Sequence, residues 1–148
     1  SDTAPEGVDD LGAHDNKEMH FSPSNNFYYI PRQAFTPQFY IGEGEERYFE
    51  YPAKATGNDC FGAFPGEYDW YETVKLNYGV DYTGGGRCHF DPIPDTWYKM
   101  LDILLFWCGK GADAFRCDMA HMVPRILELG YFESERKLPL GYIHCRDL

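Results

Sequence analysis

The stretch from residue 95 to residue 118 constrains the fold more than any other part of this chain. Asp95-Thr96 supplies a helix N-cap. Apolar side chains then recur at the i, i+4, i+7, i+8, i+11 spacing of one helical face: Trp97, Leu101, Leu104, Leu105 and Cys108. Gly109 and Gly111 end the predicted helix, and residues 112–118 are suited to a short strand. A capped helix, a glycine exit and a strand make half of a βαβ unit, which predicts an α/β fold with a parallel sheet.

The first 94 residues differ in character from this helix-strand unit. They are dense in Gly, Pro, Asn and Asp, which form turns, and they show no sustained helical or strand period. We expect one long, irregular excursion with short strands at residues 27–30 and 48–51. An excursion of this length is either functional or part of something larger. Residues 125–148 do not continue the α/β alternation, so three regions are predicted: 1–94, 95–124 and a tail at 125–148.

Charge and apolar content narrow the classes of partner. The 148 residues carry a formal net charge of −11, which repels the phosphates of nucleic acid and of anionic lipids. No apolar run approaches the roughly 18 to 20 residues of a membrane helix. The five cysteines are odd in number, so at least one has no intramolecular disulfide partner. We therefore expect neither nucleic acid nor membrane as a partner, and the cysteines favour a reducing, cytoplasmic location.

The end of the predicted strand carries the residues with the clearest chemistry. Side chains alternate along a strand, so Arg116 and Asp118 point to one face and Cys117 to the other. Active sites collect at the carboxyl ends of parallel strands. A nearby guanidinium favours the ionised form of a carboxyl group, and an ionised carboxylate is a competent nucleophile toward an anomeric carbon. Arg-x-Asp alone is a common pattern, and a surface ion pair is the alternative interpretation.

The residues around this pair resemble a known family. The run GADAFRCDMA at residues 111–120 is similar to the motif around the nucleophile of the α-amylase family, glycoside hydrolase family 13. The stretch from Asn77 to Trp107 resembles the run into the third helix of the family's (β/α)₈ barrel. The resemblance covers residues 51–124, and residues 1–94 would match the excursion, often called domain B, that follows the third barrel strand.

The resemblance implies a retaining glycosidase acting on α-glucan oligosaccharides or polysaccharides. Asp118 would be the nucleophile and Arg116 its electrostatic partner, with His121 or Met122 lining the sugar subsites. A whole barrel needs about 200 to 250 residues, so we expect a fragment of the barrel. The family's acid/base Glu and its transition-state-stabilising Asp have no counterpart in this sequence.

The missing carboxylates leave two functions open. One is a glycoside hydrolase of the α-amylase class, present as a truncated piece without a complete catalytic set. The other is a non-catalytic carbohydrate-binding or structural remnant, because aromatic residues make up 18% of the chain and flat rings stack on sugars.

No metal or other cofactor is expected from the ligand patterns. Cys88-His89 with Cys117 and His121 fits no zinc signature. A loop near the N-terminus is acidic, with Asp2, Asp9, Asp10 and Asp15. Its carboxylate oxygens are ligands that calcium takes, although we favour a solvated loop without a bound ion. We also expect a homo-oligomer, because a lone strand at residues 112–118 would pair with a copy of itself or with residues 27–30.

Overall fold

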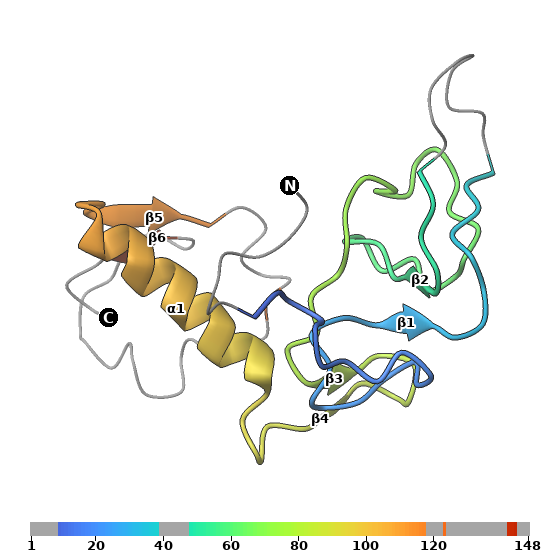
Figure 1. The fold of residues 1–148 in the computed structure, drawn as a ribbon, viewed down its shortest axis with the longest axis horizontal. Coiled ribbons are helices and arrows are strands. Elements are labelled where there is room, and N and C mark those ends of the chain that lie inside the picture. The colour runs from blue at the N-terminus through green and yellow to red at the C-terminus, as the bar shows by residue number, and fades with distance from the viewer. Residues whose placement is uncertain (1–8, 39–47, 118–122, 124–141, 145–148) are drawn as a thin grey trace. The chain divides into compact units, whose positions relative to one another are not determined.

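A computed structural model of the protein describes residues 9–38, 48–117, 123 and 142–144 (Figure 1). The chain divides into two compact units, Ser1–Thr96 and Trp97–Leu148. We call them the N-terminal unit and the C-terminal unit and describe each by itself. Within the described residues, no helix is long and apolar enough to cross a membrane.

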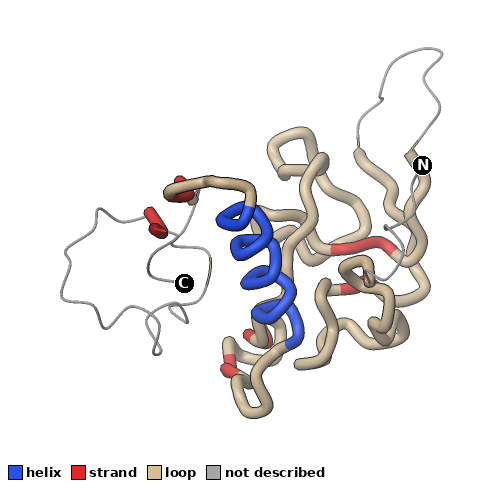
Figure 2. Tube along the Cα trace, turned by 60° about the vertical axis from the view of Figure 1, so that its left-hand side comes forward, coloured by secondary structure: helices blue, strands red, loops and turns tan. Residues whose placement is uncertain are grey.

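The N-terminal unit is held together by two short antiparallel pairs of strands. β1 (Tyr29–Ile30) pairs with β2 (Ala53–Lys54), and β3 (Val80–Asp81) pairs with β4 (Arg87–Cys88). Turns and irregular segments make up most of the rest, as the tan tube in Figure 2 shows. β1 lies within the predicted strand at residues 27–30. The predicted strand at residues 48–51 is wrong, because this segment has no ladder partner along its length.

Side-chain hydrogen bonds replace much of the ladder that such short strands cannot provide. In the described part of the unit, the buried apolar residues include Tyr28, Tyr29, Ile30, Ala53, Ala55, Ala63 and Val80. Buried polar residues lie beside them: Asn25, Asn26, Glu50, Thr56, Lys75, Asn77 and Thr96. Asn25 both accepts from the backbone N–H of Asn16 at 2.8 Å and donates to its carbonyl at 2.9 Å. Buried backbone groups need partners, and the asparagine amides supply them.

The Asn26 side chain links the backbone at Gly12 to the start of the helix. Its Oδ1 accepts from the backbone N–H of Gly12 at 2.8 Å. Its Nδ2 donates to Thr96 Oγ1 at 3.0 Å and to Asp95 Oδ2 at 3.2 Å. Asp95 and Thr96 form the first turn of α1 (Asp95–Gly109). The buried amide therefore fixes where the helix begins.

The structure confirms the predicted start of the helix at Asp95 and its predicted end at Gly109. α1 ends at Gly109, and Gly111 follows in the left-handed region with φ +96°. Of the predicted inner face, Trp97, Leu101, Leu104 and Cys108 are half-buried, whereas Leu105 is exposed. Further large apolar side chains of α1 are exposed as well: Tyr98, Ile103, Phe106 and Trp107. A helix that is apolar around most of its circumference is typical of a buried position.

The strand that follows the helix pairs differently from our expectation. β5 (Ala114–Arg116) is shorter than the predicted 112–118, and it pairs antiparallel with β6 (Tyr142–His144). Antiparallel pairing needs no crossover connection, so a later segment of the same unit can satisfy the backbone groups of β5. Among the described strands, β6 is the partner that β5 has, so the parallel sheet and the pairing with residues 27–30 in an oligomer stay predictions. The barrel fragment itself stays a prediction.

Candidate functional site

Arg116 is the described member of the predicted catalytic pair. It is the last residue of β5, and it is exposed together with Ala114, whereas Phe115 between them is half-buried. This alternation agrees with the strand geometry from which the Arg116–Asp118 pair was inferred. Asp118, His121 and Met122 lie outside the described residues, so their arrangement around Arg116 stays a prediction.

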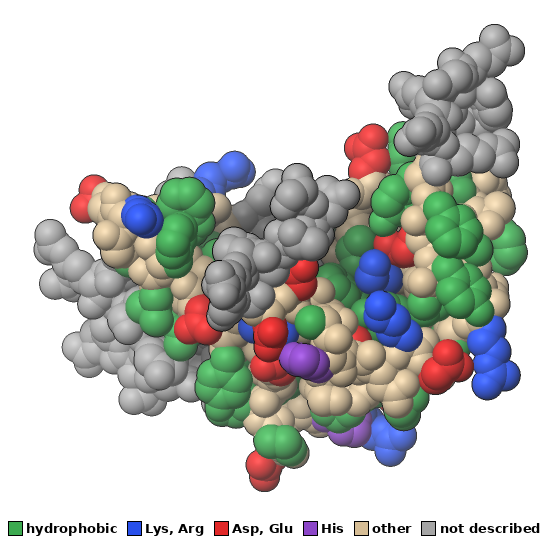
Figure 3. Space-filling view, viewed as in Figure 1, with side chains coloured by type: hydrophobic (Ala, Val, Ile, Leu, Met, Phe, Trp, Pro, Cys, Tyr) green, Lys and Arg blue, Asp and Glu red, His purple; other side chains and the backbone are tan. Residues whose placement is uncertain are grey.

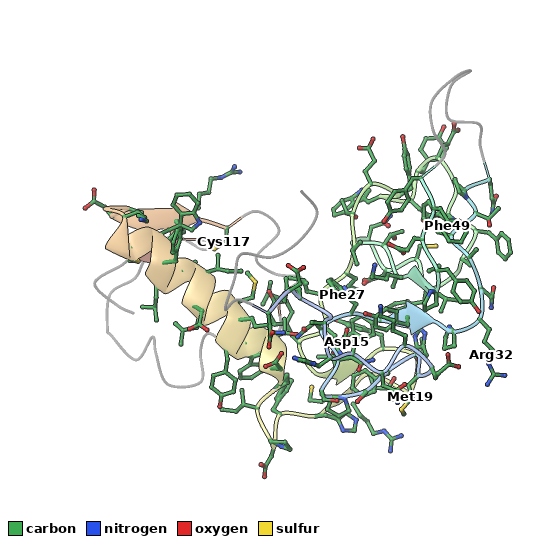
Figure 4. All side chains as sticks on the ribbon, viewed as in Figure 1. Asp15, Met19, Phe27, Arg32, Phe49 and Cys117 are labelled. Atoms are coloured by element: carbon green, nitrogen blue, oxygen red, sulfur yellow. The ribbon has the colours of Figure 1, made fainter. Side chains whose placement is uncertain are left out.

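Cys117, labelled in Figure 4, is the half-buried neighbour of Arg116. Burial raises the pKa of its thiol, which makes the reactive thiolate rarer at neutral pH. Cys60, Cys88 and Cys117 are free, whereas Cys108 is disulfide-bonded. A disulfide is unusual in the reducing location that the cysteine count favoured, and that location stays a prediction.

Two carboxylates of the acidic loop that we considered for calcium, Asp9 and Asp15, make local polar contacts, whereas Asp2 lies outside the described residues. Asp15 accepts from the backbone N–H groups of Asn26 at 2.7 Å and Phe27 at 3.1 Å (Figure 4). Asp9 lies 3.1 Å from the ring Nε2 of His14. In the part of the chain that the structure describes, no three His, Cys, Asp or Glu side chains gather as a metal site would require.

A second charged cluster, which the sequence did not predict, lies in the N-terminal unit. The ammonium group of Lys75 forms an ion pair with Asp59 and lies 4.6 Å from the ring centroid of Tyr82. Only 7% of the Lys75 side chain is exposed, against 46% for Asp59. Burial, with a further contribution from the Asp59 charge, raises the pKa of Tyr82. A buried ammonium group needs such partners, since an uncompensated charge there would be costly.

The loop that carries Asp59 is tightly bonded. Asp59 has a φ of +71° and donates its N–H to the Thr56 carbonyl at 3.1 Å. The Thr56 hydroxyl donates to Asn58 Oδ1 at 2.7 Å, and the same oxygen accepts from the backbone N–H of Trp70 at 3.0 Å. A positive φ is uncommon for a residue other than Gly, but Asp adopts it more readily than most because its short side chain can bond the local backbone. The residue types of the run Gly57-Asn58-Asp59 are those of a turn, and no periodicity in the sequence predicts a site there.

The N-terminal unit also carries exposed aromatic rings. Hydrophobic side chains gather on the surface at the right of Figure 3, where the N-terminal unit lies and where Figure 4 labels Phe49. Among the described residues of the unit, the exposed aromatic side chains are those of Tyr48, Phe49, Tyr51, Phe64, Tyr68, Trp70 and Tyr82. Exposed large apolar side chains in such numbers indicate an interaction surface.

Two curated proteins of Cereibacter sphaeroides are similar to part of this chain. Both are named α-1,4-glucan:maltose-1-phosphate maltosyltransferase, and each is 35% identical over 66 residues. The match covers 40% of this chain but only 11% and 10% of the relatives, so the chain spans about a tenth of their length. No protein-family model and no solved structure matches. The finding supports a partial relationship to carbohydrate-active enzymes of this kind.

Proposed function

We propose that this chain carries the nucleophile of an enzyme that acts on α-glucans. Asp118 is the nucleophile and Arg116 its charged partner. The observation that carries the proposal is the 35% identity to two α-1,4-glucan maltosyltransferases. The position of Arg116 supports it, since Arg116 ends the first strand after α1 and its glycine exit.

The chemistry is that of a retaining glycosyl transfer. The Asp118 carboxylate attacks the anomeric carbon, the bond to the leaving group breaks, and a covalent glycosyl ester forms. Water or a sugar hydroxyl then displaces the ester, which gives hydrolysis or transfer. Arg116 favours the ionised carboxylate before attack. His121 and Met122 flank the bound sugar in this proposal. A second carboxyl group must protonate a sugar leaving group, and none of the residues here is assigned to that role.

A substrate that needs no acid isolates the role of Asp118. Fluoride departs from α-maltosyl fluoride without protonation by a general acid, so formation of the ester depends on the nucleophile alone. We expect intact-protein mass spectrometry to show the addition of one maltosyl group. The Asp118→Asn variant should show none, because an amide is a poor nucleophile.

A matched variant separates specific from random labelling. Asp113 is an exposed aspartate just before β5, and Asp113→Asn should be labelled as fully as the parent chain. Equal labelling of Asp118→Asn, or no labelling of the parent chain, would contradict the proposed nucleophile.

A second candidate function is carbohydrate binding without catalysis. The exposed aromatic rings of the N-terminal unit favour it, because a flat, solvated ring can stack on a sugar. In that case the chain would bind an α-glucan and show no labelling that depends on Asp118.

A further inference from the structure

We infer that Cys108 forms its disulfide bond with Cys145, and that the redox state of this pair decides how firmly β5 is held. Cys108 is disulfide-bonded. The other described cysteines are free: Cys60, Cys88 and Cys117. The sequence has five cysteines, so Cys145 is the partner that the chain itself offers. Cys145 lies outside the described residues, and the pairing therefore follows by elimination.

The register of β5 and β6 indicates which residue Cys145 would face. Ala114 of β5 is opposite His144 of β6 in the antiparallel ladder. The next step along such a ladder pairs the residue before Ala114 with the residue after His144. One further step would therefore set Cys145 opposite Asp113. The fifth cysteine would then meet the chain just before β5, a short distance in sequence after Cys108.

The chain turns back onto the end of α1 between Cys108 and β5. The Gly111 N–H donates to the Cys108 carbonyl at 2.9 Å, and the Ala112 N–H donates to the Trp107 carbonyl at 3.1 Å. Gly111 has a φ of +96°, a conformation with which helices commonly end. A disulfide joins residues whose Cα atoms lie within about 7 Å of each other. This turn therefore favours Cys108 as the partner of a residue opposite position 113.

β5 and β6 are short, so their pairing gains stability from a covalent link. Each strand has three residues, and an isolated two-stranded hairpin is marginally stable in water. The bond between Cys108 and Cys145 would close a loop that contains both strands. Such a bond restricts the unfolded chain and so favours the paired state. Its loss should let β6 separate from β5.

The link matters for the proposed function because β5 ends in Arg116. Arg116 is the charged partner assigned to Asp118, so this consequence rests on the proposed nucleophile. A chain with an intact disulfide holds the strand that carries Arg116, whereas a reduced chain does not. Reduction should therefore slow the labelling of Asp118 by α-maltosyl fluoride, and the pair would act as a redox switch on the site.

Thiol–disulfide exchange switches the pair with a dithiol or a small disulfide as the co-reactant. A thiolate of dithiothreitol attacks one sulfur of the bond, and the second thiol of the reagent displaces the resulting mixed disulfide. The protein gains two electrons and two protons and is left with two thiols, while the reagent leaves as a cyclic disulfide. Oxidised glutathione reverses the reaction by accepting two electrons and leaving as two thiols.

Counting the free thiols of the denatured, unreduced chain tests the pairing. The parent chain should show three, those of Cys60, Cys88 and Cys117. Cys108→Ser should raise the count to four because it releases Cys145, and Cys145→Ser should do the same by releasing Cys108. Cys88→Ser is the matched control: Cys88 is exposed and free, so its loss should lower the count to two.

Hydrogen exchange at β6 tests the link between redox state and strand pairing. Dithiothreitol should speed exchange of the Tyr142–His144 amides about a hundredfold in the parent chain. Cys88→Ser should respond to the reagent as the parent chain does. Cys108→Ser should exchange fast from the start and show no response.

The outcomes separate this inference from the proposed nucleophile. A parent count other than three free thiols, or a count below four in Cys145→Ser, would exclude the pairing. Equal exchange of β6 before and after reduction would exclude the control of β5. Neither measurement depends on catalysis, so an absence of Asp118 labelling would contradict the proposed nucleophile and leave the disulfide pairing unaffected.

Discussion

The substitution Asn26→Ala should be among the most damaging in the N-terminal unit. Asn26 is 1% exposed, and its amide makes three hydrogen bonds, to Gly12, Asp95 and Thr96. Each buried hydrogen bond contributes about 1 kcal/mol, and the partners left behind lose their solvation as well. We therefore expect a loss of about 3 kcal/mol in the free energy of unfolding, a large share of the roughly 5 to 15 kcal/mol typical of a domain.

Urea unfolding followed by circular dichroism measures this loss. Asn26→Asp should be comparably harmful, because it keeps the Oδ1 acceptor but places a second carboxylate beside Asp95. Asn16→Ala is the matched control, because Asn16 is exposed and its Oδ1 accepts from the Glu18 N–H at 3.1 Å. A loss below about 1 kcal/mol for Asn26→Ala, equal to that of Asn16→Ala, would refute the role of the buried amide.

Three further predictions concern pH, backbone geometry and association. Burial raises the pKa of Tyr28 in the folded state, so its contribution to stability should be intact below the unfolded pKa near 10 and fall by about 1.4 kcal/mol per pH unit above it. Tyr28→Phe should make the fall measured in urea titrations from pH 9 to 11 shallower by about that amount, while the other tyrosines with a raised pKa keep the rest of it. Gly79→Ala should lower the midpoint temperature of thermal unfolding, because φ at Gly79 is +88° and an added Cβ would lie 2.6 Å from the His89 carbonyl oxygen. Gly62→Ala is the control and should leave this midpoint unchanged, because a Cβ there would meet open space. We expect the exposed apolar side chains of α1 to drive formation of a homo-oligomer. The double variant Phe106→Ser, Trp107→Ser should therefore have a lower mass by light scattering, closer to that of the monomer. A monomeric parent chain at micromolar concentration would contradict this prediction.

The helix was predictable because its signals are local. An N-cap at Asp95, an apolar stripe and a glycine exit all lie within 17 residues, and each acts on its own neighbours. The pairing of β5 was not predictable, because the choice between a parallel and an antiparallel partner depends on a segment about 30 residues away. Backbone hydrogen bonding accepts either partner, so the sequence of β5 alone carries no preference.

The polar centre of the N-terminal unit escaped prediction for a different reason. Asn25 and Asn26 are turn formers by composition, and no pattern distinguishes a buried asparagine from an exposed one. Their burial follows from short strands that leave backbone groups to be satisfied by side chains. Of the candidate site, the motif at Arg116 was found through its resemblance, whereas the Lys75–Asp59 pair needed the three-dimensional arrangement to bring residues 16 positions apart together.

Comparison of two glucans of opposite linkage tests most directly whether this chain recognises α-glucans. Calorimetric titration of the intact chain with maltoheptaose should give a saturable heat, and titration with cellohexaose, whose glucose units are β-linked, should give none. Equal heats for the two sugars, or no heat for either at millimolar concentration, would contradict an α-glucan function for this protein.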